Sequence, residues 1–290
     1  MITLYARAKI NLSLDIVGKR NDGYHLLRGV MQSIALYDKV TIKKIYKENY
    51  LKVVTNSSFL PTDARNIAYK TAELLINKYG IYDGVFIDLE KNIPVSAGLA
   101  GGSADCAAVL SGMRDVFDLN MSFEEMLEIG LSLGADVPFC LTRGTLLTEG
   151  IGEKLERLKP MPNAWVLLVK QPVSVSTAEI FKAYGTTDVP PNLRPDVDKM
   201  LFYIKKSDLR GICGQMANIL EPVTAGMHPE IWLIKEKLLE TGALGAVMSG
   251  SGPTVFGIYE KRKTANETIK IIQETFPNIK DIILTKTFNA

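Results

Sequence analysis

The segment PVSAGLAGGSA at residues 94–104 limits the folds open to this chain more than any other stretch. It is built of glycines and other small residues, between the strand-like GVFIDLEKNI and the helix-compatible DCAAVL. Glycine allows unusual backbone angles and the close approach of another group. A tight strand-to-helix turn without chemistry would need such residues, and so would a phosphate-binding loop at the first N–H groups of a helix. The local sequence leaves both structures open.

The common nucleotide-binding motifs do not occur in this chain. There is no G-x-x-x-x-G-K-[ST] segment, and residues 94–104 lack the strict G-x-G-x-x-G spacing and the N-terminal βαβ setting of a dinucleotide fold. A phosphate site here would depend on glycine conformation and on the helix N-terminus that Ser103 and Ala104 open.

The charge balance and the rare residue types exclude several functions. A net charge of +2 gives no reason to expect a nucleic acid or an acidic membrane surface as partner. Three cysteines and two histidines, all far apart, predict neither a disulfide framework nor a zinc site. No apolar run reaches the roughly 18 residues of a membrane span, and the N-terminus lacks a signal peptide's features. We therefore expect a cytoplasmic protein, with no protein partner implied.

Hydrophobic periodicity predicts a mixture of strands and helices. Apolar residues alternate at 10–16, which indicates a strand with Lys9 on its polar face, and 38–45 is a strand candidate separate from the extended pattern at 24–37. Residues 66–80 are predicted to form a helix that stops at a glycine. Because strict βαβ alternation is missing, we expect an α+β fold in two lobes.

The boundary between the two lobes is predicted from proline content. The segment LKPMPN at 158–163 carries two prolines and follows a hairpin-like stretch. The chain is therefore divided into residues 1–158 and residues 159–290.

Three further features could carry chemistry, and each has a structural alternative. Lys9 is most simply a solvent-exposed charge, although Asn11 and Ser13 share its face and could line a cleft with it. Asp136 lies among apolar residues in GADVPFC, so its carboxylate must be paired, hydrogen-bonded or functional. The segment GSG at 250–252 fits a tight hairpin between core strands or a second backbone nest beside a ligand.

Taken together, these segments resemble the GHMP kinase superfamily. Its phosphate loop follows P-x-x-x-G-L-x-x-[GS]-S-[AS], and Pro94, Gly98, Leu99 and Ser103 stand at the matching positions. Ser96 replaces a glycine often found two places before the Gly-Leu pair. The resemblance covers nearly the whole chain through three more segments, AKINLSLDIVGKRNDGYHLL at 8–27, GADVPFC at 134–140 and GSGPTVFG at 250–257.

The resemblance implies a two-lobed GHMP kinase fold of the α+β class, with the active site in the cleft between the lobes. Residues 1–158 would hold the ATP phosphate loop and the catalytic pair, and residues 159–290 would form the C-terminal lobe. AKINL, DGYH and GADVPF together are typical of the branch that phosphorylates the 2-hydroxyl of a cytidine-diphosphate-linked methylerythritol in the non-mevalonate isoprenoid route. ATP and Mg²⁺ are the implied cofactors, and the implied partner is this small-molecule substrate.

The same resemblance assigns the catalytic and nucleotide-binding residues. Lys9 and Asp136 would be the catalytic pair, with Asp136 at the hydroxyl proton and Lys9 stabilising charge on the aspartate and the transferring phosphoryl group. No metal ligand is certain, but Ser103 is a candidate for Mg²⁺. Asn66 would lie near adenine, and Lys91 just before the loop, unless they are a helix cap and a surface lysine. The loop residues expected at ATP are Pro94, Val95, Ser96, Ala97, Gly98, Leu99, Ala100, Gly101, Gly102, Ser103 and Ala104.

The acceptor site is assigned in the same way. The resemblance places Tyr24 and His25 at cytosine, with Phe181 stacked on the opposite face, and gives Asn11 and Thr177 polar contacts to the substrate. Phe181 alone could equally be a core residue of a helix. Two other functions remain open, a mevalonate- or homoserine-type kinase and a non-catalytic nucleotide-binding protein on the same scaffold. The DGYH segment argues against the first, and retention of both catalytic residues argues against the second.

Overall fold

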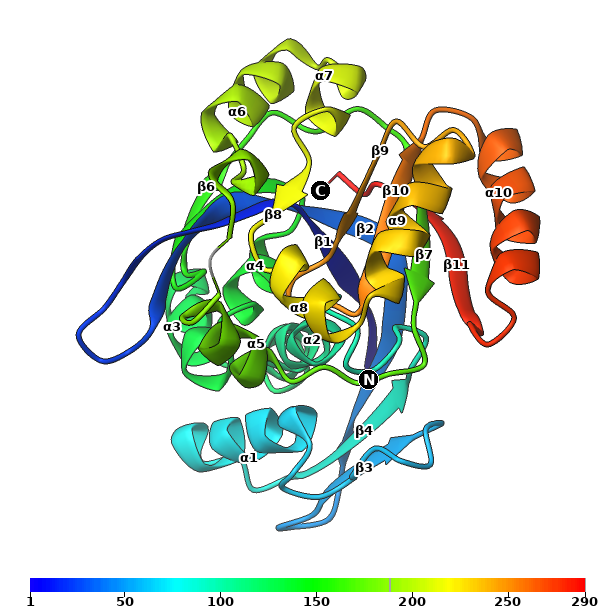
Figure 1. The fold of residues 1–290 in the computed structure, drawn as a ribbon. Coiled ribbons are helices and arrows are strands. Elements are labelled where there is room, and N and C mark those ends of the chain that lie inside the picture. Colours follow the sequence, from blue (N-terminus) through cyan, green and yellow to red (C-terminus); the bar gives the residue numbers. More distant parts are fainter. Residues whose placement is uncertain (188, 290) are drawn as a thin grey trace. The chain divides into compact units, whose positions relative to one another are not determined.

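A computed structural model describes residues 1–187 and 189–289, and it contains both helices and strands throughout (Figure 1). The chain forms two compact units, which are described separately. Unit 1 comprises residues 1–8, 36–95 and 100–142, and unit 2 comprises residues 9–35, 96–99 and 143–290. The predicted division at residue 158 stays a prediction.

The strands are β1 (Ile2–Lys19), β2 (His25–Ile45), β3 (Leu51–Thr55), β4 (Gly84–Glu90), β5 (Thr145–Gly150), β6 (Lys154–Arg157), β7 (Trp165–Lys170), β8 (Ala217–Asn218), β9 (Gly245–Met248), β10 (Thr254–Tyr259) and β11 (Asp281–Lys286). The helices are α1 (Ile67–Tyr79), α2 (Gly101–Val116), α3 (Phe123–Leu133), α4 (Val137–Thr142), α5 (Thr177–Tyr184), α6 (Val197–Lys206), α7 (Leu209–Cys213), α8 (Glu221–Met227), α9 (Glu230–Glu240) and α10 (Arg262–Thr275), with a 3-10 turn η1 (Pro191–Leu193).

Unit 1 combines three paired strand segments with four helices. In it, β4 pairs antiparallel with residues 39–45 of β2 and parallel with β3. Helix α1 packs on β3 and on α2, and α2 packs on α3 and α4. Asn66 Oδ1 accepts from Ala68 N and caps the start of α1, and Gly80 ends it with a φ of 61°. The predicted helix at 66–80 is therefore confirmed.

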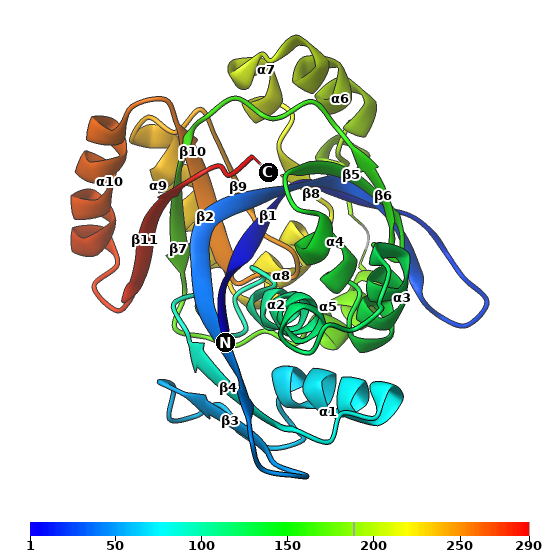
Figure 2. The same cartoon turned by 180° about the vertical axis from the view of Figure 1, so that it is seen from behind.

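Unit 2 contains two sheets. In one, residues 27–32 of β2 pair with β5, β5 pairs with β6, and β8 runs parallel to β1 beside Ser13 and Leu14. The other has the strand order β11-β7-β10-β9. Helices α9 and α10 pack on this second sheet (Figures 1 and 2). Leu167 and Val169, which point to the same face of β7, share a core with these helices.

Two predictions about strands need correction. The separate strand expected at 38–45 was wrong, because β2 continues without a break from His25 to Ile45. The exposed interpretation of Lys9 was also wrong. Both faces of β1 are buried around it, and Lys9 is 3% exposed. The polar face that was predicted from alternation is thus part of the interior.

The mixed strand and helix content agrees with the α+β class predicted from the sequence. None of the helices in the described part of the chain is both long enough and apolar enough to cross a membrane.

Candidate functional site

The glycine-rich turn of residues 249–252 joins β9 to β10 in unit 2, and two polar side chains donate hydrogen bonds to it and to the end of β9. Asn218 Nδ2 donates to the carbonyl oxygens of Met248 (2.8 Å) and Gly250 (2.7 Å). Thr224 Oγ1 donates to Ser251 O (3.2 Å). Because backbone carbonyls that face away from a ladder need donors, these side chains give a short turn one defined shape. The turn joins two paired strands, so the hairpin interpretation of the GSG segment is confirmed, and a backbone nest beside a ligand stays a prediction.

Gly98 of the loop contacts that turn. Ser249 Oγ donates to Gly98 O (2.9 Å), and a Cβ built on Gly98 would overlap the carbonyl oxygen of Ser249. Its φ of +71° is also one that side chains rarely adopt. Glycine is therefore required at this position by backbone conformation and by space.

Lys9 lies beside the same two segments. Its backbone N–H donates to Leu99 O (3.1 Å), and its ammonium donates to Asn11 Oδ1 (2.7 Å). A Cβ on Gly250 would lie 3.4 Å from Lys9 Nζ and 3.3 Å from Gly98 O. We call Lys9, Asn11, Gly98 and Gly250 the lysine cluster. The ammonium of Lys9 is thus close to the backbone of Gly250, where the absence of a side chain allows this approach.

The residues predicted to bind the acceptor divide into two groups in unit 2. Thr177, at the start of α5, shares a hydrogen bond of 2.9 Å with Ser251 Oγ, which links it to the turn. His25 packs against Phe181 with ring centroids 5.3 Å apart and against the edge of Tyr184 at 5.9 Å. Burial, and then the charge of Lys19, lower the pKa of His25, which favours the neutral imidazole. Tyr24 is 61% exposed.

The second half of the loop opens helix α2 in unit 1. Ala100 is its N-cap with a φ of 57°, and the first helical bond joins Ala104 N to Ala100 O (2.9 Å). The N–H groups of Gly101, Gly102 and Ser103 therefore precede that bond at the positive end of the helix dipole. This geometry suits an anion.

Asp136 directly precedes the short helix α4, and its carbonyl accepts the N–H of Cys140 (3.1 Å). Its side chain is half-buried. A Cβ on Gly134 would lie 3.7 Å from Ser103 Oγ. The structure thus brings the segment of Asp136 to the first turn of α2, where the candidate metal ligand Ser103 lies.

Lys91 is not a surface lysine, the alternative considered from its sequence. Its ammonium contacts the carboxylates of Asp38 and Asp105, and its side chain is 7% exposed. Burial by itself lowers the pKa of Lys91, but the charges of Asp105 and Asp38 raise it by more. Lys91 is consequently held in its charged form inside unit 1.

Several functional candidates were missed in the sequence. Ser249 and Asn218 hold the loop and the turn, and Asp38 and Asp105 bind Lys91. The GSG segment pointed to Ser249, its neighbour, but Asn218, Asp38 and Asp105 have no distinctive local pattern. Residues 94–104 pass from unit 1 into unit 2 and return. Because Lys9 belongs to unit 2 and Asp136 to unit 1, their pairing and the cleft between lobes stay predictions.

No group of three His, Cys, Asp or Glu side chains suited to a metal ion occurs within residues 1–187 and 189–289. Mg²⁺ in phosphate sites is held by one or two protein oxygens together with the phosphates. A hydroxyl such as that of Ser103, at the start of α2, fits that kind of site.

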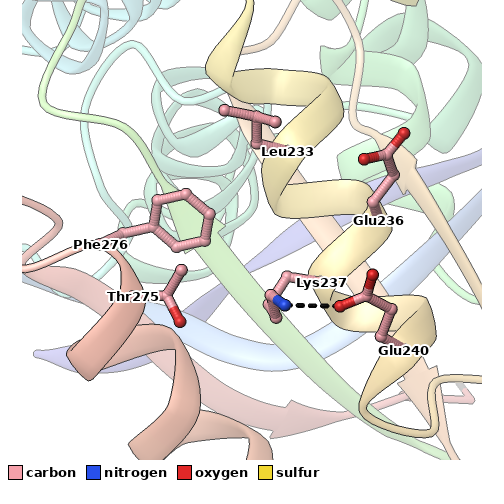
Figure 3. A pocket seen from close by; sticks show the side chains of 6 residues that line it. All are labelled: Leu233, Glu236, Lys237, Glu240, Thr275 and Phe276. Carbon is pink, nitrogen blue, oxygen red and sulfur yellow. Dashed lines mark hydrogen bonds and ion pairs between the residues drawn. The ribbon is translucent and has the colours of Figure 1, made fainter.

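A surface hollow elsewhere in unit 2 lies between α9 and the end of α10 (Figure 3). It is lined by Leu233, Glu236, Lys237, Glu240, Thr275 and Phe276. On α9, along one wall of the hollow, Lys237 forms an ion pair of 2.5 Å with Glu240. None of the predicted site residues lines this hollow, so it is separate from the candidate site.

Comparison with known proteins identifies the relatives of this chain. Residues 66–144 match the family described as GHMP kinases N terminal domain, and residues 201–278 match GHMP kinases C terminal. A 4-diphosphocytidyl-2-C-methyl-D-erythritol kinase of Clostridium botulinum (strain Alaska E43) is 46% identical over 97% of this chain and 98% of the relative.

Solved structures show the same likeness. The crystal structure of a 4-(cytidine 5'-diphospho)-2C-methyl-D-erythritol kinase superposes with a TM-score of 0.81 at 26% identity, covering 100% of both chains. A homoserine kinase from Cytophaga hutchinsonii has a TM-score of 0.78 at 20% identity, covering 99% of this chain and 94% of its own, which shows a shared fold. The fold that the sequence predicted is confirmed.

The fit of Gly98 against the turn can be tested by comparing two alanine variants. Gly80→Ala, at a φ of 61° with open space around it, should lower the free energy of unfolding by about 1 kcal/mol through strain alone. Gly98→Ala adds the overlap with Ser249 O and should cost about 2–4 kcal/mol. Urea denaturation measures both. Equal losses of unfolding free energy in the two variants would show that residues 98 and 249 can move apart without an energetic penalty.

Proposed function

The chain belongs to the GHMP kinases, and we propose that it transfers the γ-phosphoryl group of ATP to the 2-hydroxyl of 4-diphosphocytidyl-2-C-methyl-D-erythritol in the non-mevalonate route to isoprenoid precursors. The observation that carries the proposal is the lysine cluster. It sets a buried ammonium beside the backbone of Gly250, in a chain 46% identical over nearly its whole length to a relative of this name.

The nucleotide is proposed to bind at the loop of residues 94–104. The N–H groups of Gly101, Gly102 and Ser103 would donate to phosphate oxygens, and the dipole of α2 favours their charge. Gly98 and the other small residues let the backbone approach closely. Asn66 and Lys91 are proposed to lie toward the adenine end. Asn66 already caps α1, so its side-chain amide has a fixed orientation there.

Phosphoryl transfer is proposed to use Asp136 and Lys9. Asp136 accepts the proton of the acceptor hydroxyl, whose oxygen forms a bond to the γ-phosphorus while the bond to the β–γ bridging oxygen breaks and ADP leaves. Lys9 stabilises the negative charge that spreads over the transferring group. Ser103 Oγ is the proposed protein ligand of Mg²⁺, which would screen the charge of the phosphates.

The acceptor's cytosine is proposed to bind beside His25 and Phe181. The contact between these two rings in unit 2 supports the proposal, because it gives an aromatic surface on which a base would stack. Tyr24 would cover the base from the exposed hairpin, and Asn11 and Thr177 would make polar contacts. Thr177 can do so from a fixed position because it bonds to Ser251.

Acceptor selectivity tests the proposed function. ADP release is measured with the cytidine-bearing substrate, with methylerythritol phosphate, with mevalonate and with homoserine. We expect rapid turnover with the first and very slow turnover with the others, since only the first can use the aromatic surface. Preference for mevalonate or homoserine would give the chain another kinase function, and ATP binding without any turnover would favour a non-catalytic role.

A carboxylate variant tests the proposed base. Asp136→Asn keeps the size of the side chain but cannot accept the proton, so kcat should fall about 100-fold or more while the Kd for ATP changes little. Asp88→Asn, at an exposed carboxylate on β4, is the matched control and should be as active as the wild type. Steady-state kinetics distinguishes the two, and full activity of Asp136→Asn would remove Asp136 from the mechanism.

A phenylalanine variant tests the cytosine site. Stacking on an aromatic side chain contributes about 1–3 kcal/mol per base, so Phe181→Ala should raise the acceptor KM roughly 5- to 150-fold. The KM for ATP should stay the same. Phe202→Ala, on the exposed side of α6, should change neither constant. An effect of Phe181→Ala on ATP alone would place cytosine elsewhere.

A further inference from the structure

Three charged side chains meet in the interior of unit 1, next to the start of α2. They are Asp38 of β2, Lys91 at the end of β4 and Asp105 of α2, and their side chains are 0%, 7% and 6% exposed. We call them the buried ionic trio. None of them is proposed to touch the reacting atoms, so their burial needs another explanation.

Asp38 holds the chain just before the phosphate loop. Its Oδ1 accepts the backbone N–H groups of Asn92 (2.5 Å) and Ile93 (2.8 Å), and its Oδ2 contacts the ammonium of Lys91. A carboxylate that accepts two backbone N–H groups fixes their direction strongly. The chain that enters the loop is thereby tied to the middle of β2.

Lys91 extends this tie to the other end of the loop. Its ammonium also donates to Asp105 Oδ2 (2.5 Å), in the second turn of α2. A Cβ on Gly101 would lie 3.6 Å from Lys91 Nζ and 3.1 Å from the side chain of Ile93. The trio therefore contacts the segments that immediately precede and follow the central residues of the loop.

Burying these three charged groups costs free energy, so the trio is a poor means of stabilising the fold. Two carboxylates face one ammonium, and Asp105 Oδ1 has no hydrogen-bond partner among the described residues. Burial raises the pKa of Asp105 to about 7, although the charge of Lys91 opposes the shift. A well-packed apolar set often stabilises a fold as well as a buried ion pair does. What ionic bonds add is a fixed direction and distance between the segments that they join.

We propose that Asp38, Lys91 and Asp105 are positioning residues that fix the two ends of the phosphate loop, so that the first N–H groups of α2 meet the triphosphate in one geometry. This inference rests on the proposed function for its ligand. The side chain of Lys91 then acts on ATP through Asp38 and Asp105. A loop that is held before binding loses less conformational entropy when the phosphates arrive.

The test compares two substitutions of Asp105 by their Kd for MgATP, measured calorimetrically without acceptor. Asp105→Ala removes the link to α2 but leaves Lys91 paired with Asp38, and it should raise the Kd about 10- to 100-fold, the scale of a displaced binding group. Asp105→Asn keeps an oxygen that accepts from Lys91 and should change the Kd by about threefold or less. The KM for ATP should follow the Kd, while the acceptor KM stays constant.

A second variant covers the case in which Asp105→Ala does not fold. Asp38 uses both carboxylate oxygens, so an Asp38→Asn amide that keeps its oxygen on Asn92 N and Ile93 N turns its NH2 group toward the Lys91 ammonium, and this variant should also raise the Kd for MgATP. Tyr79→Phe is the control, because it removes another bond within unit 1, from Tyr79 Oη to Glu125 (2.7 Å), far in sequence from the loop. It should lower the melting temperature without changing the Kd.

Unchanged Kd values in Asp105→Ala and Asp38→Asn would overturn the proposal. The proposal would also be overturned if the Kd of each variant rose only in proportion to its loss of thermal stability, with Tyr79→Phe following the same proportion. The trio would then act on stability alone. Failure of the proposed function can be distinguished from failure of this inference, because the Kd for MgATP is measured without acceptor. The proposed function fails if the wild-type enzyme binds MgATP but does not phosphorylate the cytidine-bearing acceptor.

Discussion

The close approach of Gly98 to the turn of residues 249–252 is the contact on which the rest of the lysine cluster depends. Any side chain at Gly98 would overlap the Ser249 carbonyl, and one at Gly250 would crowd both Lys9 Nζ and Gly98 O. Because two backbones meet there without intervening side chains, the ammonium of Lys9 can approach Gly250. Asn218 and Thr224 stabilise this contact, because their side chains donate hydrogen bonds to carbonyl oxygens of the turn and of Met248 just before it.

Buried lysines are the second constraint, and each is accommodated differently. An ammonium removed from water must find hydrogen-bond acceptors or an opposite charge. Lys9 donates to the neutral amide oxygen of Asn11 beside the backbone of Gly250, whereas Lys91 contacts two carboxylates, one of which also holds the N–H groups of Asn92 and Ile93. The arrangement around Lys91 suits a group that joins secondary-structure elements.

Much of the fold could be predicted because it follows local rules. Asn66 and Gly80 bound α1 as a cap and a stop, and Ser122 Oγ accepts from Glu125 N at the start of α3, which is an equally local cap. The continuity of β2 could not be predicted, because two extended segments that follow each other directly have the same local pattern whether they form one strand or two. The buried ionic trio was missed for a related reason. Asp38 and Asp105 are 53 and 14 residues from Lys91, and each alone resembles an ordinary isolated charge.

The sequence by itself determined the family, through AKINL, DGYH, GADVPF and the small residues of 94–104, and it determined the two ends of α1, because both depend on neighbours within a few positions. The tertiary structure decided which charges are buried. Alternation along β1 assigns Lys9 and Asn11 to a polar face, but only the packing of distant segments covers that face and brings Gly250 within reach of it. Burial depends on what lies opposite a side chain, and the residues opposite Lys9 and Lys91 come from far along the chain.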